Sequence, residues 1–346
     1  MVSGHVRRVD LRRRVTLVGL VVGVPLSALF LWLAVSRTDL GSVWSALSAA
    51  RVGFVVGAVI AMAAVYVVQA IRWRVIAAGR ISSGRYLGLV VAGVASNNVL
   101  PGRVGDGFRG IWLARAEHIP TGRALATVVF DRGADVIALV GLLAISLPFT
   151  VHPAWLLRIV IGGIVLAALL AGFLVAARVV TRLHRRAERA RSRARRIGRD
   201  LLDALADPPG VDRVVAALAL SFVAWGIWSL GAWLVARSLG IELSAVDALL
   251  VAAVVNLGVA IPSSPGFIGT YQWLCVSTLS LLDVGRDKAL AFSLLLHASW
   301  FVPTTLAGAV FLIHRLVAQR QTKARMTRSL DVGRDPNERS TEAPRA

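Results

Sequence analysis

The stretch that decides the fold is residues 96–109, which read Ser-Asn-Asn-Val-Leu-Pro-Gly-Arg-Val-Gly-Asp-Gly-Phe-Arg. A hydrophobic run begins at Tyr86, enters this stretch, breaks there on Asn, Pro and Gly, and ends in charged residues. As a helix, residues 86–100 would be about 22 Å long, whereas the hydrocarbon core of a bilayer is about 30 Å thick. The run is therefore too short for a full crossing, and its polar end indicates a binding feature within the membrane.

The composition of the whole chain is that of a membrane protein. Of its 346 residues 56% are hydrophobic, and the mean hydropathy is +0.70, whereas soluble chains are about 45–50% apolar. The net charge of +20 could suggest nucleic-acid binding, but the basic residues lie in loops and tails between apolar runs, as in membrane proteins. The single cysteine, Cys275, lies in an apolar run and excludes a disulfide framework. We expect an all-α polytopic membrane protein.

The distribution of arginine predicts the topology. Five Arg in residues 1–14 place the N-terminus in the cytoplasm by the positive-inside rule. If residues 86–100 crossed the membrane, the ten Arg of residues 178–199 would lie outside, which that rule disfavours. A re-entrant hairpin over residues 86–123 avoids this. Its non-helical turn is tolerated only if it is buried in protein or lines a cavity.

The remaining apolar runs predict about six full spans and a second interrupted hairpin at 245–282. The charge pattern does not separate this second hairpin from two short spans. We expect full spans at about 15–35, 52–71, 124–147, 156–177, 214–236 and 289–313. The predicted organisation is a basic cytoplasmic N-terminus (1–14), a first membrane half (15–177), a basic cytoplasmic linker (178–212), a second membrane half (213–314) and a disordered cytoplasmic tail (315–346).

The two interrupted regions resemble each other. The shared features are Asn98, Leu100-Pro101 and Gly105 in the first region, and Asn256, Ile261-Pro262 and Gly266 in the second. The first unit runs from outside to inside before its hairpin, and the second runs the other way. This pattern predicts an inverted-topology repeat, and paired broken segments of this kind point to a substrate site near the membrane midplane.

Charged and polar residues at the breaks are candidates for binding an anionic phospholipid or a polyprenyl-phosphate-linked sugar. Charge inside a membrane costs about 2.5–3.5 kcal/mol per residue, so it indicates function. Guanidinium groups and the N-termini of broken helices both favour phosphate. The candidate substrate-binding residues are Asn97, Asn98, Arg103, Asp106, Arg109, Asp131, Arg132, Asp135, Asn256, Ser263, Ser264, Gln272 and His297.

Structural roles compete with binding for several of these residues. Arg109 could pair with Asp106, and Arg132 with Asp135, at i,i+3 spacing. Asp131 and Asp135 share a helix face and could carry protons or a cation, or hold Arg132 and the hairpin in place. The polar residues at the breaks could instead cap backbone groups. His297 has no second His at ligand spacing, so we expect packing and no metal. The residues expected to shape the hairpins are Pro101, Gly102, Gly105, Pro262, Pro265, Gly266 and Gly269.

Three functions fit these features. The first is a transporter or flippase of the plasma membrane with both termini cytoplasmic. The second is an intramembrane transferase or an accessory subunit of a lipid- or glycan-modifying enzyme. The third is a scaffold whose basic linker and tail dock a soluble partner. We find no P-loop, nucleophile elbow or HExxH motif in the sequence, so we expect neither enzymatic activity nor a cofactor.

The motifs resemble the lysylphosphatidylglycerol synthase transmembrane domain, a flippase-like family, over roughly residues 15–315. The matching positions are Asn98, Leu100-Pro101, Arg103, Gly105-Asp106, Asp131-Arg132 and Asp135, and later Pro262, Pro265-Gly266 and Gly269. Three positions depart from the pattern: Phe267 replaces a Gly, Gln272 a Glu and His297 an Arg. The cytosolic aminoacyl-transferase domain of the full synthases is absent from the sequence. The resemblance implies movement of a lipid head group rather than its synthesis.

Overall fold

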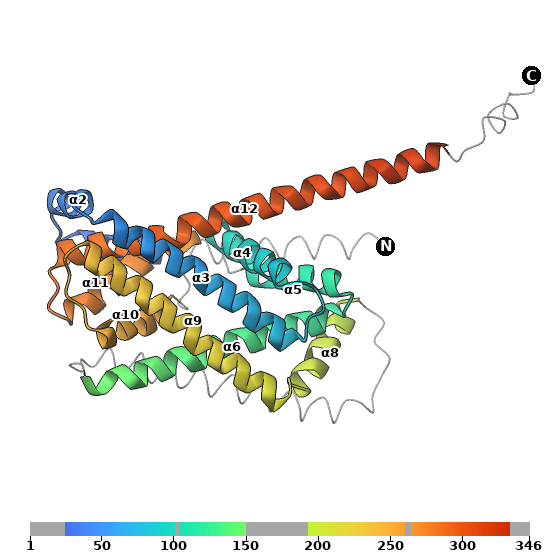
Figure 1. Ribbon diagram of the computed structural model, residues 1–346, viewed down its shortest axis with the longest axis horizontal. Helices are drawn as coiled ribbons and strands as arrows, with labels where there is room; N and C mark the ends of the chain where they lie inside the picture. Colours follow the sequence, from blue (N-terminus) through green and yellow to red (C-terminus); the bar gives the residue numbers. More distant parts are fainter. Residues whose placement is uncertain (1–24, 101–103, 150–192, 260–263, 333–346) are drawn as a thin grey trace, which may run out of the picture.

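The computed structural model describes residues 25–100, 104–149, 193–259 and 264–332, and every regular element within them is a helix (Figure 1). This confirms the all-α prediction. In chain order the elements are a helix at Pro25–Val35, α2 (Leu40–Ser48), α3 (Val52–Ala77), α4 (Ser83–Val99), α5 (Val104–Glu117), α6 (Thr121–Ser146), η2 (Leu147–Phe149), α8 (Arg193–Ala206), α9 (Val211–Ser238), α10 (Ala245–Gly258), η3 (Pro265–Phe267), α11 (Thr270–Ser280) and α12 (Arg286–Val332).

Three of the described helices are long and apolar enough to cross a membrane. They are α3 with 26 residues, α9 with 28 and the first 30 residues of α12. A helix of 26 residues is about 39 Å long, which exceeds the 30 Å hydrocarbon core. Helix α6 has the same length as α3 but carries charged residues at its middle. The expected span at 156–177, and most of the one at 15–35, lie outside the described residues.

The two interrupted regions form pairs of short helices. Helices α4 and α5 have 17 and 14 residues, and α10 and α11 have 14 and 11. These lengths correspond to about 26, 21, 21 and 17 Å, so each helix is shorter than a full crossing. Helices α4 and α5 touch through their backbones, because a Cβ added to Gly105 would overlap the carbonyl oxygen of Gly93. Glycine at this position is what allows the first hairpin to close.

The two hairpins approach each other inside the bundle. Helices α4 and α5 lie in one half of the view in Figure 1, and α10 and α11 in the other. Gly266, in the turn of the second hairpin, has φ +69°, and a Cβ there would lie 3.3 Å from the carbonyl oxygen of Asn98 in the first hairpin. Hairpins that point toward each other from opposite halves are the arrangement that the inverted repeat predicts.

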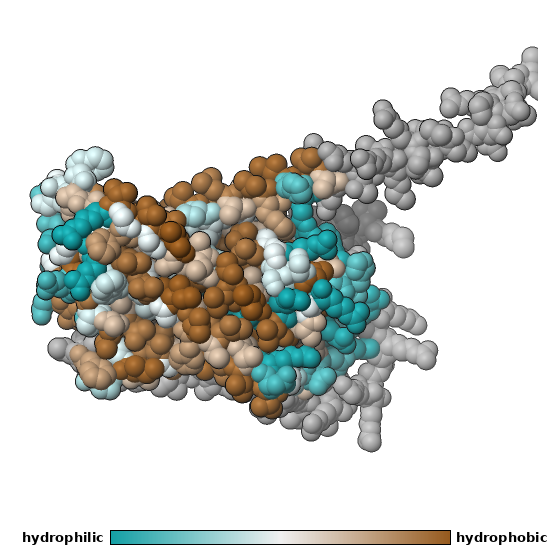
Figure 2. Space-filling model, in the orientation of Figure 1, coloured by the Kyte–Doolittle hydropathy of each residue, from teal (hydrophilic) through white to brown (hydrophobic). Residues whose placement is uncertain are grey.

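The hydrophobic core of the described residues consists of separate clusters of different size. The largest apolar cluster surrounds α10, whose residues from Leu250 to Val255 are all fully buried. A helix that is apolar all round, as α10 is, belongs in an interior. A smaller cluster between α3, α4, α5 and α6 includes Trp73, Tyr86 and Leu113. Figure 2 shows apolar side chains across the middle of the visible face and hydrophilic ones toward both ends, as expected for a membrane-embedded body.

The basic linker and the C-terminal tail both contribute helix. The end of the basic linker forms α8, which packs on α6 so closely that a Cβ on Gly122 would overlap the carbonyl oxygen of Ile197. Helix α12 continues to Val332, although we expected disorder from residue 315. Hydrophobic periodicity was the wrong criterion for the tail. Residues 315–332 are rich in helix-forming Ala, Arg, Gln, Lys and Leu, and no Gly or Pro interrupts them before Gly333.

Candidate functional site

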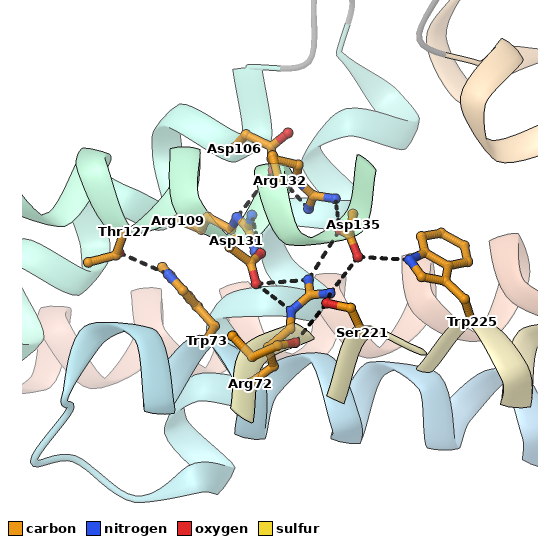
Figure 3. A network of polar contacts seen from close by, with 11 residues as sticks. Arg72, Trp73, Asp106, Arg109, Thr127, Asp131, Arg132, Asp135, Ser221 and Trp225 are labelled. Atoms are coloured by element: carbon orange, nitrogen blue, oxygen red, sulfur yellow. Dashed lines mark hydrogen bonds and ion pairs between the residues drawn. The ribbon is translucent and has the colours of Figure 1, made fainter. Parts of the chain in front are cut away.

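Six charged side chains from three helices form one network next to the first hairpin (Figure 3). Three are arginines and three are aspartates, so their formal charges cancel. The members are Arg72 of α3, Asp106 and Arg109 of α5, and Asp131, Arg132 and Asp135 of α6.

Arg72 lies at the centre of the network and is fully buried. Its Nε donates to Oδ1 of Asp131 at 2.8 Å, and its Nη1 and Nη2 donate to the two carboxylate oxygens of Asp135. Nη1 also donates to Oγ of Ser221 in α9 at 2.8 Å. Figure 3 shows the guanidinium between the two carboxylates. Because its planar fork matches carboxylate geometry, Arg72 joins α3 to α6 and α9.

Asp135 has a further partner in α9. Trp225 Nε1 donates to its Oδ1 at 3.0 Å. A buried carboxylate needs several donors to offset its desolvation, and Asp135 has them from Arg72, Arg132 and Trp225. The network is therefore tied to the second membrane half through α9.

Arg109 is the second buried arginine, with 2% of its side chain exposed. Its Nη2 donates to Oδ2 of Asp131 at 2.9 Å, and its Nε lies 3.1 Å from Oδ1 of Asp106. The guanidinium carbon lies 4.8 Å from the ring centre of Trp73, within cation–π range. Trp73 is itself fixed by its Nε1, which donates to Oγ1 of Thr127 at 2.9 Å. Arg109 thus fastens the outgoing arm of the hairpin to α6.

Arg132 forms the outer edge of the network. Its Nη1 donates to Oδ2 of Asp135 at 3.1 Å and its Nη2 to Oδ1 of Asp106 at 3.2 Å. The side chain of Arg132 is 39% exposed and that of Asp106 is 22% exposed, whereas Asp131 is 1% exposed. Both i,i+3 pairs that the sequence suggested are present. An anion that binds Arg132 would compete with Asp106, the more exposed of its two carboxylate partners.

The polar residues at the breaks form hydrogen bonds with nearby backbone groups or with a neighbouring helix. Asn97 Oδ1 accepts from the backbone N of Gly105 at the start of α5, at 2.7 Å, and Asn98 Nδ2 donates to Oγ1 of Thr305 in α12. Asn256 donates to a carbonyl oxygen in its own helix. Ser264 Oγ donates to a backbone carbonyl in its own turn. These bonds favour the capping and bracing roles over ligand contact for these four residues.

Gln272 and His297 form a neutral pair in the second half. Gln272 Oε1 accepts from the backbone N of Gly269 at 2.7 Å, and its Nε2 lies 3.0 Å from Nδ1 of His297. An amide nitrogen only donates, so Nδ1 is the acceptor and the ring proton is on Nε2. The His297 ring stacks on Tyr271 and Trp300, with centroids 4.5 and 4.9 Å apart. This supports the expected packing role for His297 and places it away from the charged network.

The backbone of the turn at residues 264–269 has conformations and close contacts that favour glycine. Phe267 has φ +60° and Gly269 has φ +91°. A Cβ on Gly269 would overlap the carbonyl oxygen of Ser27, so only glycine fits there. Phe267 stands where the family pattern has glycine, and a bulky side chain in this left-handed region is strained.

Five of the predicted residues lie outside the described parts of the chain. They are Pro101, Gly102, Arg103, Pro262 and Ser263. Of the described substrate-binding candidates, the structure brings together Asp106, Arg109, Asp131, Arg132 and Asp135.

The sequence-based candidates for the site did not include Arg72, Ser221 and Trp225. The predicted span at 52–71 ends just before Arg72, because the apolar run ends at Ile71, and this places Arg72 in the basic loop that follows. Helix α3 continues to Ala77, and the apolar Trp73 and Ile76 that follow Arg72 were a signal that the helix did not end. Ser221 and Trp225 lie one helical turn apart in an apolar span and carried no signal that could be separated from ordinary packing.

Comparison with known proteins agrees with this geometry. A curated relative from Pyrococcus horikoshii, described as a UPF0104 membrane protein, is 26% identical over 330 residues, which cover 86% of this chain and 96% of the relative. The family described as the lysylphosphatidylglycerol synthase TM region matches residues 17–308. That match includes the whole charged network and both hairpins. The chain is therefore a membrane protein that belongs to the lysylphosphatidylglycerol synthase TM region family.

Proposed function

We propose that this chain is a transporter or flippase of the plasma membrane, that both of its termini are cytoplasmic, and that it binds the phosphate of an anionic lipid or lipid-linked head group at Arg132. The observation that carries the proposal is the partial exposure of Arg132 at the edge of an otherwise buried ionic network. A buried network holds its arginines in a fixed geometry, and the exposed edge gives a ligand access to one of them.

The charge balance supports exchange of a carboxylate for a phosphate. Asp106 forms salt bridges with both Arg132 and Arg109. It is the most exposed of the network's three aspartates. If Asp106 moved away, three arginines would face two aspartates, and the site would have a net charge of +1. A phosphate oxygen would restore neutrality through charge-assisted hydrogen bonds.

The position of Asp106 also favours an anion. Asp106 lies in the first turn of α5, where the free backbone N–H groups and the helix dipole attract negative charge. The hairpin therefore offers the N-terminus of α5 and the guanidinium of Arg132 on the same side of the network. The description of the family names a lipid synthase, which supports a lipid as the ligand.

The test uses the purified chain in liposomes. Translocation of a fluorescent phosphatidylglycerol, and of a polyprenyl-phosphate-linked sugar, is measured for the wild type and for Arg132→Gln. Losing charge-assisted hydrogen bonds worth about 1.5–3 kcal/mol would slow translocation by about tenfold or more. Arg37→Gln, which alters an exposed arginine away from the network, is the matched control and should retain the wild-type rate. If Arg132→Gln transported lipid at the wild-type rate, the assignment of the site would be wrong.

A second candidate function is a scaffold for a soluble partner. It is favoured by α12, which projects well beyond the helical bundle in Figure 1 and remains helical to Val332. Stoichiometric co-purification of a lipid- or glycan-modifying enzyme, lost when residues 320–346 are deleted, would support this candidate. A lipid product of new mass, formed by the chain and a donor alone, would instead indicate a transferase.

A further inference from the structure

A separate groove lies between α3, α4 and α12. Its volume is about 540 Å³, which is within the usual range for ligand pockets of about 300–1,000 Å³. Its lining is almost entirely apolar and includes Met62 and Tyr66 of α3, Leu87 and Val91 of α4, and Trp300 and Phe311 of α12. None of the six charged residues of the network lines it.

The groove is long and narrow. Its lining on α12 extends from Ser299 to His314, which at 1.5 Å per residue is about 22 Å. Helices α4 and α12 close its floor, because a Cβ on Gly88 would overlap the ring of Phe311. At Gly84 the groove is open, since a Cβ there would meet no heavy atom of the described chain within 4 Å. This shape matches an extended hydrocarbon chain better than a compact ligand.

The groove faces the outside of the bundle. Helices α3 and α12, which form two of its walls, are long and apolar enough to cross a membrane. Apolar side chains beside and along it are exposed, among them Val67 at 44% and Val310 at 66%. In a bilayer, the molecules that reach such a surface are lipids.

Three arginines gather at the end of the groove marked by His314. Arg315 lies with its guanidinium carbon 5.7 Å from the ring centre of Phe311 and is within electrostatic range of Arg85 and Arg115, which repel it. In the described part of the chain, none of the three forms a salt bridge. The nearby Glu117 is engaged by the Tyr86 hydroxyl and by two backbone N–H groups. Among the described residues, the cluster has positive charge without a carboxylate in a salt bridge to it.

We propose that this groove holds one phospholipid with a net negative head group, with an acyl chain along α12 and the phosphate between Arg85, Arg115 and Arg315. The apolar channel and the cationic end are two independent features, and together they fit a molecule that is apolar along its length and anionic at one end. A phosphate placed among like charges relieves their mutual repulsion. The three arginines of this site are not members of the Arg132 network, and the proposal does not depend on transport.

The test is a binding measurement on the purified full chain in detergent, with fluorescent phosphatidylglycerol and phosphatidylcholine as probes. In the Arg85→Gln/Arg315→Gln variant, the affinity for phosphatidylglycerol should fall about tenfold, to the level of phosphatidylcholine. Arg37→Gln/Arg51→Gln, which also removes two positive charges and alters exposed arginines that do not line the groove, is the charge-matched control and should leave both affinities unchanged. Free glycerol phosphate should compete weakly, since it lacks the chain that the groove holds.

A second pair of variants tests the apolar channel. Gly84→Phe places a ring in the groove and should abolish binding of both lipids. Gly53→Phe is the control, because Gly53 is a helical position of α3 outside the groove where a Cβ also meets no described atom within 4 Å. A photoreactive phosphatidylglycerol with its label on the acyl chain should attach to groove residues of α4 and α12 in the unaltered protein.

Three results would overturn the proposal. They are unchanged phosphatidylglycerol affinity in the double arginine variant, unchanged affinity in Gly84→Phe, and photolabelling spread evenly over α3, α9 and α12. The labelling experiment needs no variant, so it decides the question even if a substitution impairs folding. Because translocation is not measured here, the outcome is separate from the test of Arg132.

Discussion

Replacing Arg72 by methionine should strongly destabilise the protein. Arg72 is fully buried and donates to Asp131, Asp135 and Ser221. Methionine keeps much of the side-chain volume and removes the charge, so two buried carboxylates lose their shared cation. Breaking a buried pair by removing one partner costs about 3–5 kcal/mol, because it leaves an uncompensated charge.

A charge-balanced double variant separates this effect from lost packing. In Arg72→Met/Asp135→Asn, Asp131 keeps Arg109 and Asp106 keeps Arg132, so the remaining network is again neutral. Replacing both members of a buried ion pair is often nearly neutral. We therefore expect the double variant to recover at least about half of the loss seen in the single variant, or about 1.5 kcal/mol or more.

The assay is reversible unfolding in mixed micelles, followed by tryptophan fluorescence, with the free energy of unfolding extracted for each variant. Arg74→Met is the matched control. Arg74 is an exposed arginine of the same helix, with a single exposed hydrogen bond to Ser83, and its loss should change the free energy by no more than about 0.5 kcal/mol. The reasoning would be refuted if Arg72→Met cost no more than Arg74→Met, or if the double variant were less stable than Arg72→Met.

Two further predictions concern the hairpin and an exposed helix cap. Gly105→Ala should destabilise the protein by about 1–3 kcal/mol, because the added Cβ would overlap the backbone of α4. Gly107→Ala is the control and should be tolerated, because a Cβ there would meet no described atom within 4 Å. Thermal unfolding of both variants in detergent compares their stabilities. Asp39 caps α2, and hydrogen bonds from the Ser42 hydroxyl and from backbone N–H groups lower its pKa below the ordinary 3.8. A lowered pKa means that its stabilisation is complete above the unfolded pKa and is lost as the pH falls through the folded one. The stability difference between wild type and Asp39→Ala should thus be constant from pH 5 to pH 8 and shrink below about pH 4; a constant difference at pH 3 would contradict this.

The helix breaks could be predicted because they depend on local chemistry. Residues 96–109 contain Pro, Gly and Asn close together. Proline lacks the backbone N–H that a helix interior needs, and Gly and Asn have low helix propensity, so their combination favours a break. Helix α4 ends at Val99 and α5 begins at Val104, close to the predicted turn. The tail was predicted less well, since high helix propensity extends α12 without any apolar period to indicate it.

The role of Arg72 could not be predicted from the pattern along the chain. A hydropathy profile ends the span at Ile71 and assigns the next arginine to a loop. Whether an arginine near the end of a span faces solvent or a partner depends on how the helix is rotated against its neighbours. In this structure Trp73, Tyr86 and Leu113 pack in the cluster between α3, α4, α5 and α6, and that packing turns Arg72 toward Asp131 and Asp135.

The sequence by itself determined that the chain is a membrane protein of helices, that its helices are interrupted in two regions, and that Asp131 and Asp135 share one face of α6. Each of these follows from composition, length or spacing along a single helix. Only the tertiary structure decided which arginine meets which aspartate, and that Arg132 alone of the network's arginines is substantially exposed. The physical reason is that an ion pair needs two helices at a fixed distance and rotation, and close contacts such as Gly93 against Gly105 set both.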